Sequence, residues 1–418
     1  MHLIEELSWR GLIQDFTAGT TEWLQNHTVK GYIGFDPTAD SLHIGSLLPI
    51  LLLVHLQRAG HHPIALVGGG TGRIGDPSGK STERTLLDEE NLQHNLSCIR
   101  HQIEHILQQT GKPYTILNND EWFREMKFID FARDIGKHIT VNYMMAKESV
   151  KKRMESGLSF TEFTYQLMQA YDFYYLFTHY NCTLQMGGAD QWGNITTGIE
   201  LIRKLTGKEA YAFTCPLLTR SDGSKFGKSE SSENIWLDPQ KTSPYQFYQF
   251  WINLADADAE KMIKIFTFLS QEEIQEIVET HRVHPEQRTL QKKLAAEITR
   301  FVHGDEGLSQ ALQTTQQLFS KTSGALPSES ELQTMEGVER ISLPYTDQDI
   351  ELINLLAEKT HIFPSKGEVR RMIQNGGLYL NKQKVTDASK MIQRDDLLYG
   401  KYLLIQKGKK HHYLIEFT

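Results

Sequence analysis

The sequence predicts an α/β protein whose amino-terminal part is a doubly wound, Rossmann-like parallel sheet. Three consecutive segments carry this prediction. Residues 29–36 (VKGYIGFD) form an apolar, strand-like run, residues 43–58 have a helical pattern that stops at Gly60, and residues 63–69 (PIALVGG) form a second apolar run. A strand, a helix and a strand so close together require a right-handed crossover between parallel strands. Pro49 lies inside the helical segment, so we expect either a kink or a later helix start.

The same alternation continues further along the chain. Strands are expected at 114–119 and 182–188, and helices around 130–135 and 161–177. Residues 243–319 are helical and strand-poor, which is typical of a bundle.

Composition marks the boundaries after that bundle. A stretch rich in Ser, Glu and Pro predicts a linker or a loosely held arm, and the tail after it again combines helical and strand-like segments. We therefore expect a Rossmann-like catalytic domain over 1–222, a loop and helical domain over 223–319, a linker over 320–349 and a small α+β domain over 350–418.

The composition describes a globular chain for a reducing compartment. Hydrophobic residues make up 39% of the 418 residues and charged residues 23%, which is enough apolar content for several cores. The apolar run at 47–54 is too short to span a membrane, and the amino terminus lacks the features of an export signal. Cys98, Cys182 and Cys215 are dispersed, which predicts a cytoplasmic protein without a zinc or other protein-bound metal site.

Charge is distributed unevenly along the chain. The whole sequence has a net charge of -8, but residues 350–418 contain 12 Lys or Arg against 7 Asp or Glu, a net of +5. The remaining 349 residues therefore carry -13. A basic tail on an acidic body predicts a separate module for a polyanionic partner, and a chance surplus of surface charge is the alternative.

Residues 39–50 (ADSLHIGSLLPI) place His43, Gly45 and Ser46 at the start of the first of these helices. A helix start after the first parallel strand offers free N–H groups and a positive dipole end, which favours a phosphate. Gly45 would let a base or a phosphate approach the backbone, and His43 with Thr38 could donate hydrogen bonds to a triphosphate. The alternative is an ordinary helix start capped by Ser46, because short motifs often match by chance.

A second stretch, SDGSKFGKSES at 221–231, places Lys225 and Lys228 in a Gly- and Ser-rich loop. Two ammonium groups on such a loop can follow the charge that develops as pyrophosphate leaves ATP. The alternative is a solvated charged turn. Finding both stretches in order in one α/β chain favours a shared nucleotide site.

A third group of polar residues lies on the helix that begins near Ser159. Ser159 and Glu162 have the spacing of a capping box, and Tyr165, Gln169 and Asp172 follow at i, i+4 and i+7. Their neighbours are largely apolar or aromatic, so burying three polar groups is costly unless they meet a polar ligand. The alternative is that they form the wet face of the helix.

HIGS at 43–46 and KFGKS at 225–229 are similar to the HIGH and KMSKS motifs of class I aminoacyl-tRNA synthetases. Longer segments extend the likeness over nearly the whole chain: GFDPTADSLHIGSL, PIALVGGGTGRIGDPSGKSTER, VNYMMAKESVKKR, SFTEFTYQLMQAYDF, GGADQWGNITTGIELIR and TSPYQFYQFWIN. On these segments the chain resembles the bacterial-type tyrosyl-tRNA synthetases. Ser46 departs from the second histidine of HIGH, which the class uses near the ATP ribose, and its hydroxyl has a shorter reach.

The resemblance implies a tyrosine site. Asp76, Tyr165 and Gln169 are expected to hold the α-ammonium group, and Tyr32 with Asp172 to bracket the phenolic hydroxyl. Phenylalanine would leave those buried polar groups unpaired and be rejected, a rule for which tyrosyl-tRNA synthetases are themselves the standard example.

The resemblance also implies an ATP site, with Mg²⁺ accompanying ATP. Asp190 and Gln191 are expected near the ribose and the reacting carboxylate. The catalytic set would be Thr38, His43, Gln191, Lys225 and Lys228. The expected ATP contacts are Gly34, Asp36, Gly45, Ser46, Gly188, Asp190, Lys228 and Ser229, with additional phosphate assistance from Lys80 and Arg84.

The tail resembles an S4-like RNA-binding module, which implies tRNA(Tyr) as the partner. Because family members are homodimers that bind one tRNA across both subunits, a homodimer is also expected. Phosphate contacts position RNA but carry little sequence information. The candidates for such contacts are Arg370, Arg371, Lys382, Lys384, Lys409 and Lys410, and for each one a solvated surface charge is the alternative.

Two rival interpretations stay open at this level. The tryptophan enzyme shares the class I fold, but an indole offers one donor, whereas Asp172 facing Tyr32 suits a phenol that both donates and accepts. The other rival is an RNA-binding protein with a vestigial adenylation site, for which the serine at position 46 is the argument.

Overall fold

The computed structural model describes residues 2–78, 87–154, 157–223, 226–227, 234–319, 326–335, 338–344, 349–408 and 411–418. The predicted site residues that lie outside these ranges are Lys80, Arg84, Lys225, Lys228, Ser229, Lys409 and Lys410. The chain forms two compact units, Met1–Lys241 with Phe250–Val302 and Thr242–Gln249 with His303–Thr418. The expected division at residue 222 is therefore not the one that the structure makes.

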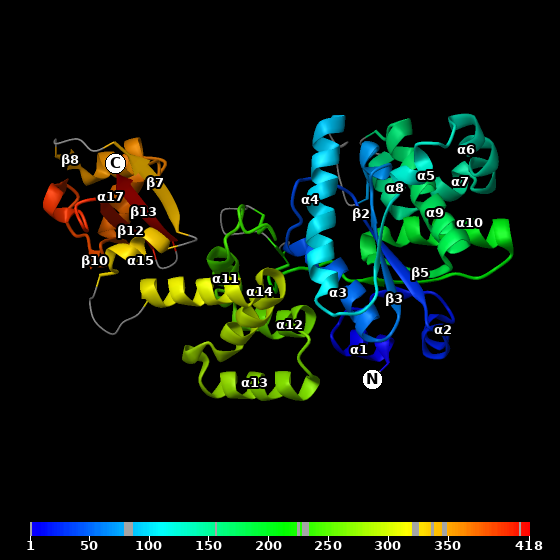
Figure 1. Ribbon diagram of the computed structural model, residues 1–418, viewed down its shortest axis with the longest axis horizontal. Coiled ribbons are helices and arrows are strands. Elements are labelled where there is room, and N and C mark those ends of the chain that lie inside the picture. Colours follow the sequence, from blue (N-terminus) through cyan, green and yellow to red (C-terminus); the bar gives the residue numbers. More distant parts are fainter. Residues whose placement is uncertain are drawn as a thin grey trace. The chain divides into compact units, whose positions relative to one another are not determined.

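A six-stranded sheet forms the centre of the first unit (Figure 1). All neighbouring strands are parallel except β1, which pairs antiparallel with β6. The predicted Rossmann-like sheet is confirmed, and β1 and β6 are the strands that the sequence did not single out. From edge to edge the strands are β1 (Asp15–Phe16), β6 (Tyr211–Cys215), β5 (Cys182–Gly188), β2 (Lys30–Phe35), β3 (His62–Val67) and β4 (Thr115–Asn118).

Helices cover both faces of this sheet (Figure 1). α3 (Ile44–Arg58) and α4 (Glu89–Gln108) connect β2, β3 and β4, whereas α9 (Phe160–Tyr180) and α10 (Trp192–Thr206) precede and follow β5. Right-handed crossovers place these two pairs on opposite faces, because the chain moves from β2 in one direction and from β5 in the other. The strand order thus reverses between β2 and β5, which opens a crevice at their carboxyl ends.

α3 is buried on nearly all sides, which explains its continuous apolar run. From Leu47 to Gln57 every residue except Pro49 is buried. The helix begins at Ile44 and continues through Pro49, so the later start considered from the sequence is wrong. Pro49 has no N–H for the carbonyl of Gly45 one turn earlier, so one intrahelical hydrogen bond is missing beside the helix start.

Further helices of the first unit lie before, between and after the strands. They are α1 (Leu3–Trp9), α2 (Thr20–Asn26), α5 (Asp120–Phe123), α6 (Phe128–Asp134), α7 (Val141–Met145), α8 (Glu148–Met154), α12 (Asp256–Phe266) and α13 (Gln271–Val283). Two more helices, α11 (Pro244–Ile252) and α14 (Thr289–Phe319), contribute residues to both units. Gly304 interrupts α14 with φ 74° and ψ 179°, a conformation that is open essentially to glycine alone.

The second unit contains a five-stranded sheet. β7 pairs parallel with β13, and the remaining neighbours are antiparallel. Because α15 (Glu329–Thr334) and β7 come from the stretch expected to be a linker, the assignment of 320–349 as a linker is wrong. The order of the strands is β10 (Gln383–Lys384), β9 (Leu378–Leu380), β12 (Tyr402–Lys407), β13 (His411–Phe417) and β7 (Glu339–Leu343). α16 (Leu352–Asn354), α17 (Lys366–Gln374) and the paired β8 (Ile350–Glu351) and β11 (Met391–Ile392) complete the unit.

Candidate active site

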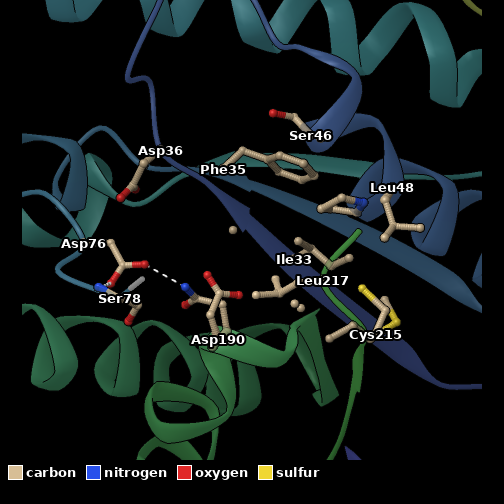
Figure 2. A pocket seen from close by; sticks show the side chains of 18 of the residues that line it. Ile33, Phe35, Asp36, Ser46, Leu48, Asp76, Ser78, Asp190, Cys215 and Leu217 are labelled. Carbon is tan, nitrogen blue, oxygen red and sulfur yellow. Dashed lines mark hydrogen bonds between the residues drawn. The ribbon is translucent and has the colours of Figure 1, made fainter. Parts of the chain in front are cut away.

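A cavity of about 650 Å³ lies at the carboxyl ends of β2 and β5, where α3 begins. Figure 2 shows the carboxylates of Asp36 and Asp76 on one side of it and the apolar Ile33, Leu48 and Leu217 on the other. The structure thus brings the described predicted residues of the first unit together. Those that line the cavity are Tyr32, Gly34, Asp36, Thr38, His43, Gly45, Ser46, Asp76, Tyr165, Gln169, Asp172, Gly188, Asp190 and Gln191.

Asp172 and Tyr32 form a buried polar pair within this lining. Their exposed fractions are 3% and 1%. The two carboxylate oxygens of Asp172 accept hydrogen bonds from Trp122 Nε1 at 2.8 Å and from Asn119 Nδ2 at 3.0 Å. The Tyr32 hydroxyl is buried and has no hydrogen-bond partner among the described residues. A buried hydroxyl without a hydrogen-bond partner costs free energy. This end of the cavity therefore offers a ligand the unpaired Tyr32 hydroxyl beside the oriented carboxylate of Asp172.

Burial shifts the pKa of both groups. It raises the pKa of the Asp172 carboxyl well above its usual range, against the hydrogen bonds from Asn119 and Trp122, which lower it. Burial also raises the pKa of the Tyr32 hydroxyl, and the nearby Asp172 carboxylate raises it further. Tyr32 therefore keeps its proton at neutral pH and can donate it to a ligand.

Asn119 connects this end of the cavity to its carboxylate-lined side. Its Nδ2 also donates to Thr71 Oγ1 at 2.9 Å, and the Thr71 hydroxyl donates to Asp36 Oδ1 at 2.8 Å. The other Asp36 oxygen accepts the hydroxyl of Tyr165 at 2.8 Å. Because an ionised carboxylate only accepts, each donor in this network has one direction. The network fixes Asp172, Asp36 and Tyr165 relative to one another.

A second set of hydrogen bonds surrounds Asp76. Its carboxylate accepts Gln191 Nε2 at 2.7 Å, the bond drawn in Figure 2, and the backbone N–H of Ser78 at 2.9 Å. Asn194 Nδ2 donates to the side-chain oxygen of Gln169 at 2.9 Å. Asn194 Nδ2 also donates to the Gln191 side-chain oxygen at 3.3 Å, which connects Asp76, Gln191 and Gln169.

The two signature stretches meet at the start of α3. The backbone of Gly227 lies so close to Gly45 that a Cβ atom on Gly227 would be 3.6 Å from the Gly45 nitrogen. The Ile44 N–H donates to the Ile235 carbonyl at 3.0 Å, and the Ile235 N–H donates to the Gly227 carbonyl at 3.3 Å. The KFGKS stretch, through its described residues, thus lies against the HIGS helix start, as the sequence predicted.

His43 is the residue that caps the start of α3, and its side chain makes no capping hydrogen bond. The ordinary alternative, in which Ser46 caps the helix, is therefore wrong. A Cβ atom on Gly45 would lie 2.8 Å from His43 Cε1, so glycine at this position makes room for the imidazole ring. Glycine at position 45 thus has two reasons: space for the His43 ring and, as the sequence suggested, close approach of a nucleotide.

Several important residues escaped the sequence analysis. Thr71, Asn119 and Gln185 line the cavity, and Trp122 holds Asp172 from behind. Asn119 had a usable signal, because it directly follows a strand whose carboxyl end faces the crevice. Trp122 had none, since an aromatic residue on a short helix is typical of core packing.

Glu162 has a different role from the one its spacing predicted. Ser159 accepts the Glu162 N–H at 3.1 Å and begins α9, as expected. The Glu162 carboxylate turns instead to Arg153 of α8, with Nη2 and Oε2 2.5 Å apart. Both side chains are buried, with exposed fractions of 3% and 2%. This ion pair joins α8 to the helix that carries Tyr165, Gln169 and Asp172.

In the second unit the residues predicted to contact RNA differ in solvent exposure and in hydrogen bonding. Arg370 and Arg371 are exposed on α17, and Lys384 is exposed on β10. Lys382 is half-buried and donates its ammonium group to the Gln317 carbonyl at 2.9 Å. Lys382 is thus already engaged within the unit, and the two arginines are the better candidates.

Comparisons with known proteins agree with this geometry. A family model described as tRNA synthetases class I (W and Y) matches residues 24–320, and one described as Tyrosine--tRNA ligase SYY-like C-terminal domain matches residues 331–415. The tyrosine–tRNA ligases of Bacteroides fragilis and Porphyromonas gingivalis are each 53% identical over 428 residues, which cover 99% of this chain and 99% of the relative. The chain belongs to the tyrosine–tRNA ligase family of class I tRNA synthetases.

The solved structures of tyrosyl-tRNA synthetases support the same assignment. A truncated mitochondrial enzyme from Aspergillus nidulans matches with a TM-score of 0.70 at 32% identity, over 76% of this chain and 94% of that one. The one from Coccidioides posadasii matches with a TM-score of 0.67 at 30% identity, over 74% and 91%. The sequence-based assignment to the tyrosyl-tRNA synthetases is confirmed, and the tryptophan branch is set aside.

Two features are absent from the described residues. Within the ranges given above, no helix is long and apolar enough to cross a membrane. The same part of the chain contains no group of three or more His, Cys, Asp or Glu side chains arranged to hold a metal ion.

The buried Arg153–Glu162 pair yields a stability prediction. Arg153→Met removes one partner and leaves an uncompensated buried carboxylate, so the free energy of unfolding should fall by about 3–5 kcal/mol. The double variant Arg153→Met, Glu162→Leu removes both charges and should recover much of that loss. Urea unfolding measures both values, with the exposed Arg203→Met as a control that stays close to the parent. Simple additivity of the two single substitutions would contradict the prediction.

Proposed function

We propose that the protein is a tyrosine–tRNA ligase that activates L-tyrosine with ATP and transfers it to tRNA(Tyr). The observation that carries this proposal is the unpartnered Tyr32 hydroxyl beside the oriented Asp172 carboxylate. A phenol completes both groups, since it accepts from Tyr32 and donates to Asp172. An indole or a phenyl ring leaves at least one of them unpaired.

The first step is adenylate formation. A carboxylate oxygen of tyrosine attacks the α-phosphorus of ATP, the bond from that phosphorus to the β-phosphate oxygen breaks, and pyrophosphate leaves. The start of α3 with His43 and Thr38 offers donors for the phosphates, and Lys225 with Lys228 neutralises the charge on the leaving group. Positioning and charge are sufficient here, so no covalent nucleophile on the protein is needed.

The second step transfers tyrosine to RNA. A hydroxyl of the 3′-terminal ribose attacks the carbonyl carbon of tyrosyl-adenylate, and AMP leaves. Mg²⁺ accompanies ATP rather than residing on the protein, because Mg²⁺ prefers a few ligands together with substrate phosphates. We place the enzyme in the cytoplasm, in keeping with its three free cysteines.

Tyr32→Phe tests the tyrosine site. The substitution removes the donor for the substrate phenol, so kcat/KM for tyrosine should fall roughly tenfold while that for phenylalanine does not fall. ATP–pyrophosphate exchange with each amino acid measures this. Tyr245→Phe is the matched control, because it deletes another buried hydroxyl that has no partner among the described residues and does not line the cavity. Equal losses for both amino acids, or exchange with tryptophan exceeding that with tyrosine, would refute the assignment.

The basic tail is tested by charge reversal. Arg370→Glu with Arg371→Glu on α17 should weaken tRNA binding and make it less dependent on salt, because fewer counterions are released. Filter binding of tRNA(Tyr) across salt concentrations measures the slope, and pyrophosphate exchange without tRNA should stay at the parent rate. An unchanged salt slope would remove these arginines from the interface.

A homodimer is proposed from a gathering of exposed apolar side chains. Of the thirteen large hydrophobic residues that are well exposed among the described residues, six fall between positions 128 and 160. Contiguous exposed apolar patches mark protein–protein interfaces, and we propose that these six side chains contribute to one. The six, which we call the α6–α9 surface, are Phe128, Ile129, Val141, Met145, Met154 and Phe160.

Ile129→Lys tests that surface. Ile129 is 73% exposed, so the change should leave the fold intact and place an unpaired charge in the proposed interface. Analytical ultracentrifugation should show a shift from dimer to monomer. Val283→Lys is the matched control, since Val283 is 71% exposed on α13, outside this surface, and should leave the dimer unchanged. A dimer that tolerates Ile129→Lys as well as Val283→Lys would place the interface elsewhere.

A further inference from the structure

We propose that α12 is a platform that positions the KFGKS stretch at the cavity, with Asp258 as the positioning residue. The inference rests on the proposed function, because it concerns the rate of adenylate formation. The segment concerned runs from Thr219 to Gly227, and its described residues Thr219, Gly223 and Phe226 line the cavity. Side chains of α12 hold this segment at three points.

The first two points are polar. The Asp258 carboxylate is buried, with an exposed fraction of 5%, and accepts the backbone N–H of Ser221 at 2.7 Å. Asp258 lies in the first turn of α12, where a carboxylate commonly serves the N–H groups of its own helix. Here it serves the loop instead. One turn further, the Lys261 ammonium group donates to the Thr219 carbonyl at 3.2 Å.

The third point is an aromatic contact. Phe226 is only 3% exposed. Its ring stacks on Phe266 of α12, with centroids 6.1 Å apart, and meets Phe250 and Trp251 at 5.5 and 5.7 Å. The next residue, Gly227, has φ +99° and lies against Gly45. Phe226 and Gly227 lie between Lys225 and Lys228 in the sequence, so the contacts of α12 bear on the stretch that carries both lysines.

The platform is itself held in place from α1. The Arg10 guanidinium donates at 2.7 Å to the carbonyls of Lys264, Thr267 and Leu269, at and beyond the carboxyl end of α12. Lys264 is one of the last four residues of α12, whose carbonyls have no partner within the helix, and Thr267 and Leu269 belong to the segment that follows. Arg10 is in turn held by Glu6 at 2.7 Å. Arg10 therefore fixes the carboxyl end of α12 relative to α1.

This arrangement separates rate from affinity. The contacts of Thr219 and Ser221 with α12 hold the start of the loop before ATP reacts. Less conformational entropy is then lost when the lysines bind the phosphates in the transition state. Tyr32 lies on β2, and Asp172 is held by Asn119 and Trp122, which belong neither to α12 nor to this loop. Releasing Thr219–Ser221 from α12 should therefore leave tyrosine binding unaffected. Asp258 thus acts through the loop and touches no reacting atom.

The test compares Asp258→Ala with Asp258→Asn. The alanine variant loses the acceptor for Ser221, and the asparagine variant keeps an amide oxygen in its place. Stopped-flow measurement at saturating tyrosine and ATP should show adenylate formation slowed roughly tenfold in Asp258→Ala and largely restored in Asp258→Asn, with the tyrosine Kd unchanged in both. Active-site titration normalises each rate to folded enzyme. Glu260→Ala is the control on the same helix, because the half-buried Glu260 pairs with Arg282 of α13 rather than with the loop, and it should keep the parent rate.

Parallel measurements separate this inference from the proposed function. If the parent protein forms no tyrosyl-adenylate, the proposed function fails. If Lys228→Ala slows the reaction but Asp258→Ala does not, the function stands and the platform is overturned. A matching loss of tyrosine affinity in Asp258→Ala, or an asparagine variant as slow as the alanine variant, also overturns it.

Discussion

The reversal of strand order between β2 and β5 is the constraint on which the rest of the structure depends. Two chain segments leave the sheet in opposite directions at this point, so neither covers the carboxyl ends of these strands. The crevice left there receives residues from β2, β5, α3 and α9 at once. The described residues of the first unit that we propose for chemistry line this crevice.

The polar residues in the crevice are held by one another before any ligand arrives. Trp122 and Asn119 orient Asp172, and Thr71 extends that order to Asp36 and Tyr165. A partly satisfied buried polar network is costly, and the unpartnered Tyr32 hydroxyl beside Asp172 leaves this one incomplete. A substrate that completes it recovers that cost, whereas a substrate that lacks a hydroxyl does not. The proposed specificity for a hydroxylated ring then follows from the unpartnered Tyr32 hydroxyl beside Asp172.

The sequence predicted the parts of the fold that follow from apolar pattern. β2, β3 and β5 were found because they are largely buried apolar runs, and β4 was found although its residues are only half-buried. Sequence patterns that are compatible with more than one set of contacts were less reliable. The Ser159–Glu162 spacing correctly predicted a helix start, but the Glu162 carboxylate forms its ion pair with Arg153 rather than capping its own helix. β7 was taken for a linker because its strand identity depends on pairing with β13, about seventy residues later. Asn119 and Trp122 were missed because their role is to orient Asp172, and orientation is not a property of local sequence.

The two ends of the cavity are supported by different elements. This difference follows from which parts of the chain supply their residues. The phenol end uses β2, α9 and the segment after β4, all braced by the central sheet. The phosphate end joins α3 to a loop about 180 residues away in sequence, and this loop is held through α12 and the Arg10 clamp. A rigid end suits recognition, because a displaced Asp172 would no longer distinguish a hydroxyl. Separate support suits the phosphate end, where negative charge develops on the leaving pyrophosphate. The loop that carries the lysines can then be positioned without disturbing Tyr32 and Asp172, which we propose recognise the amino acid.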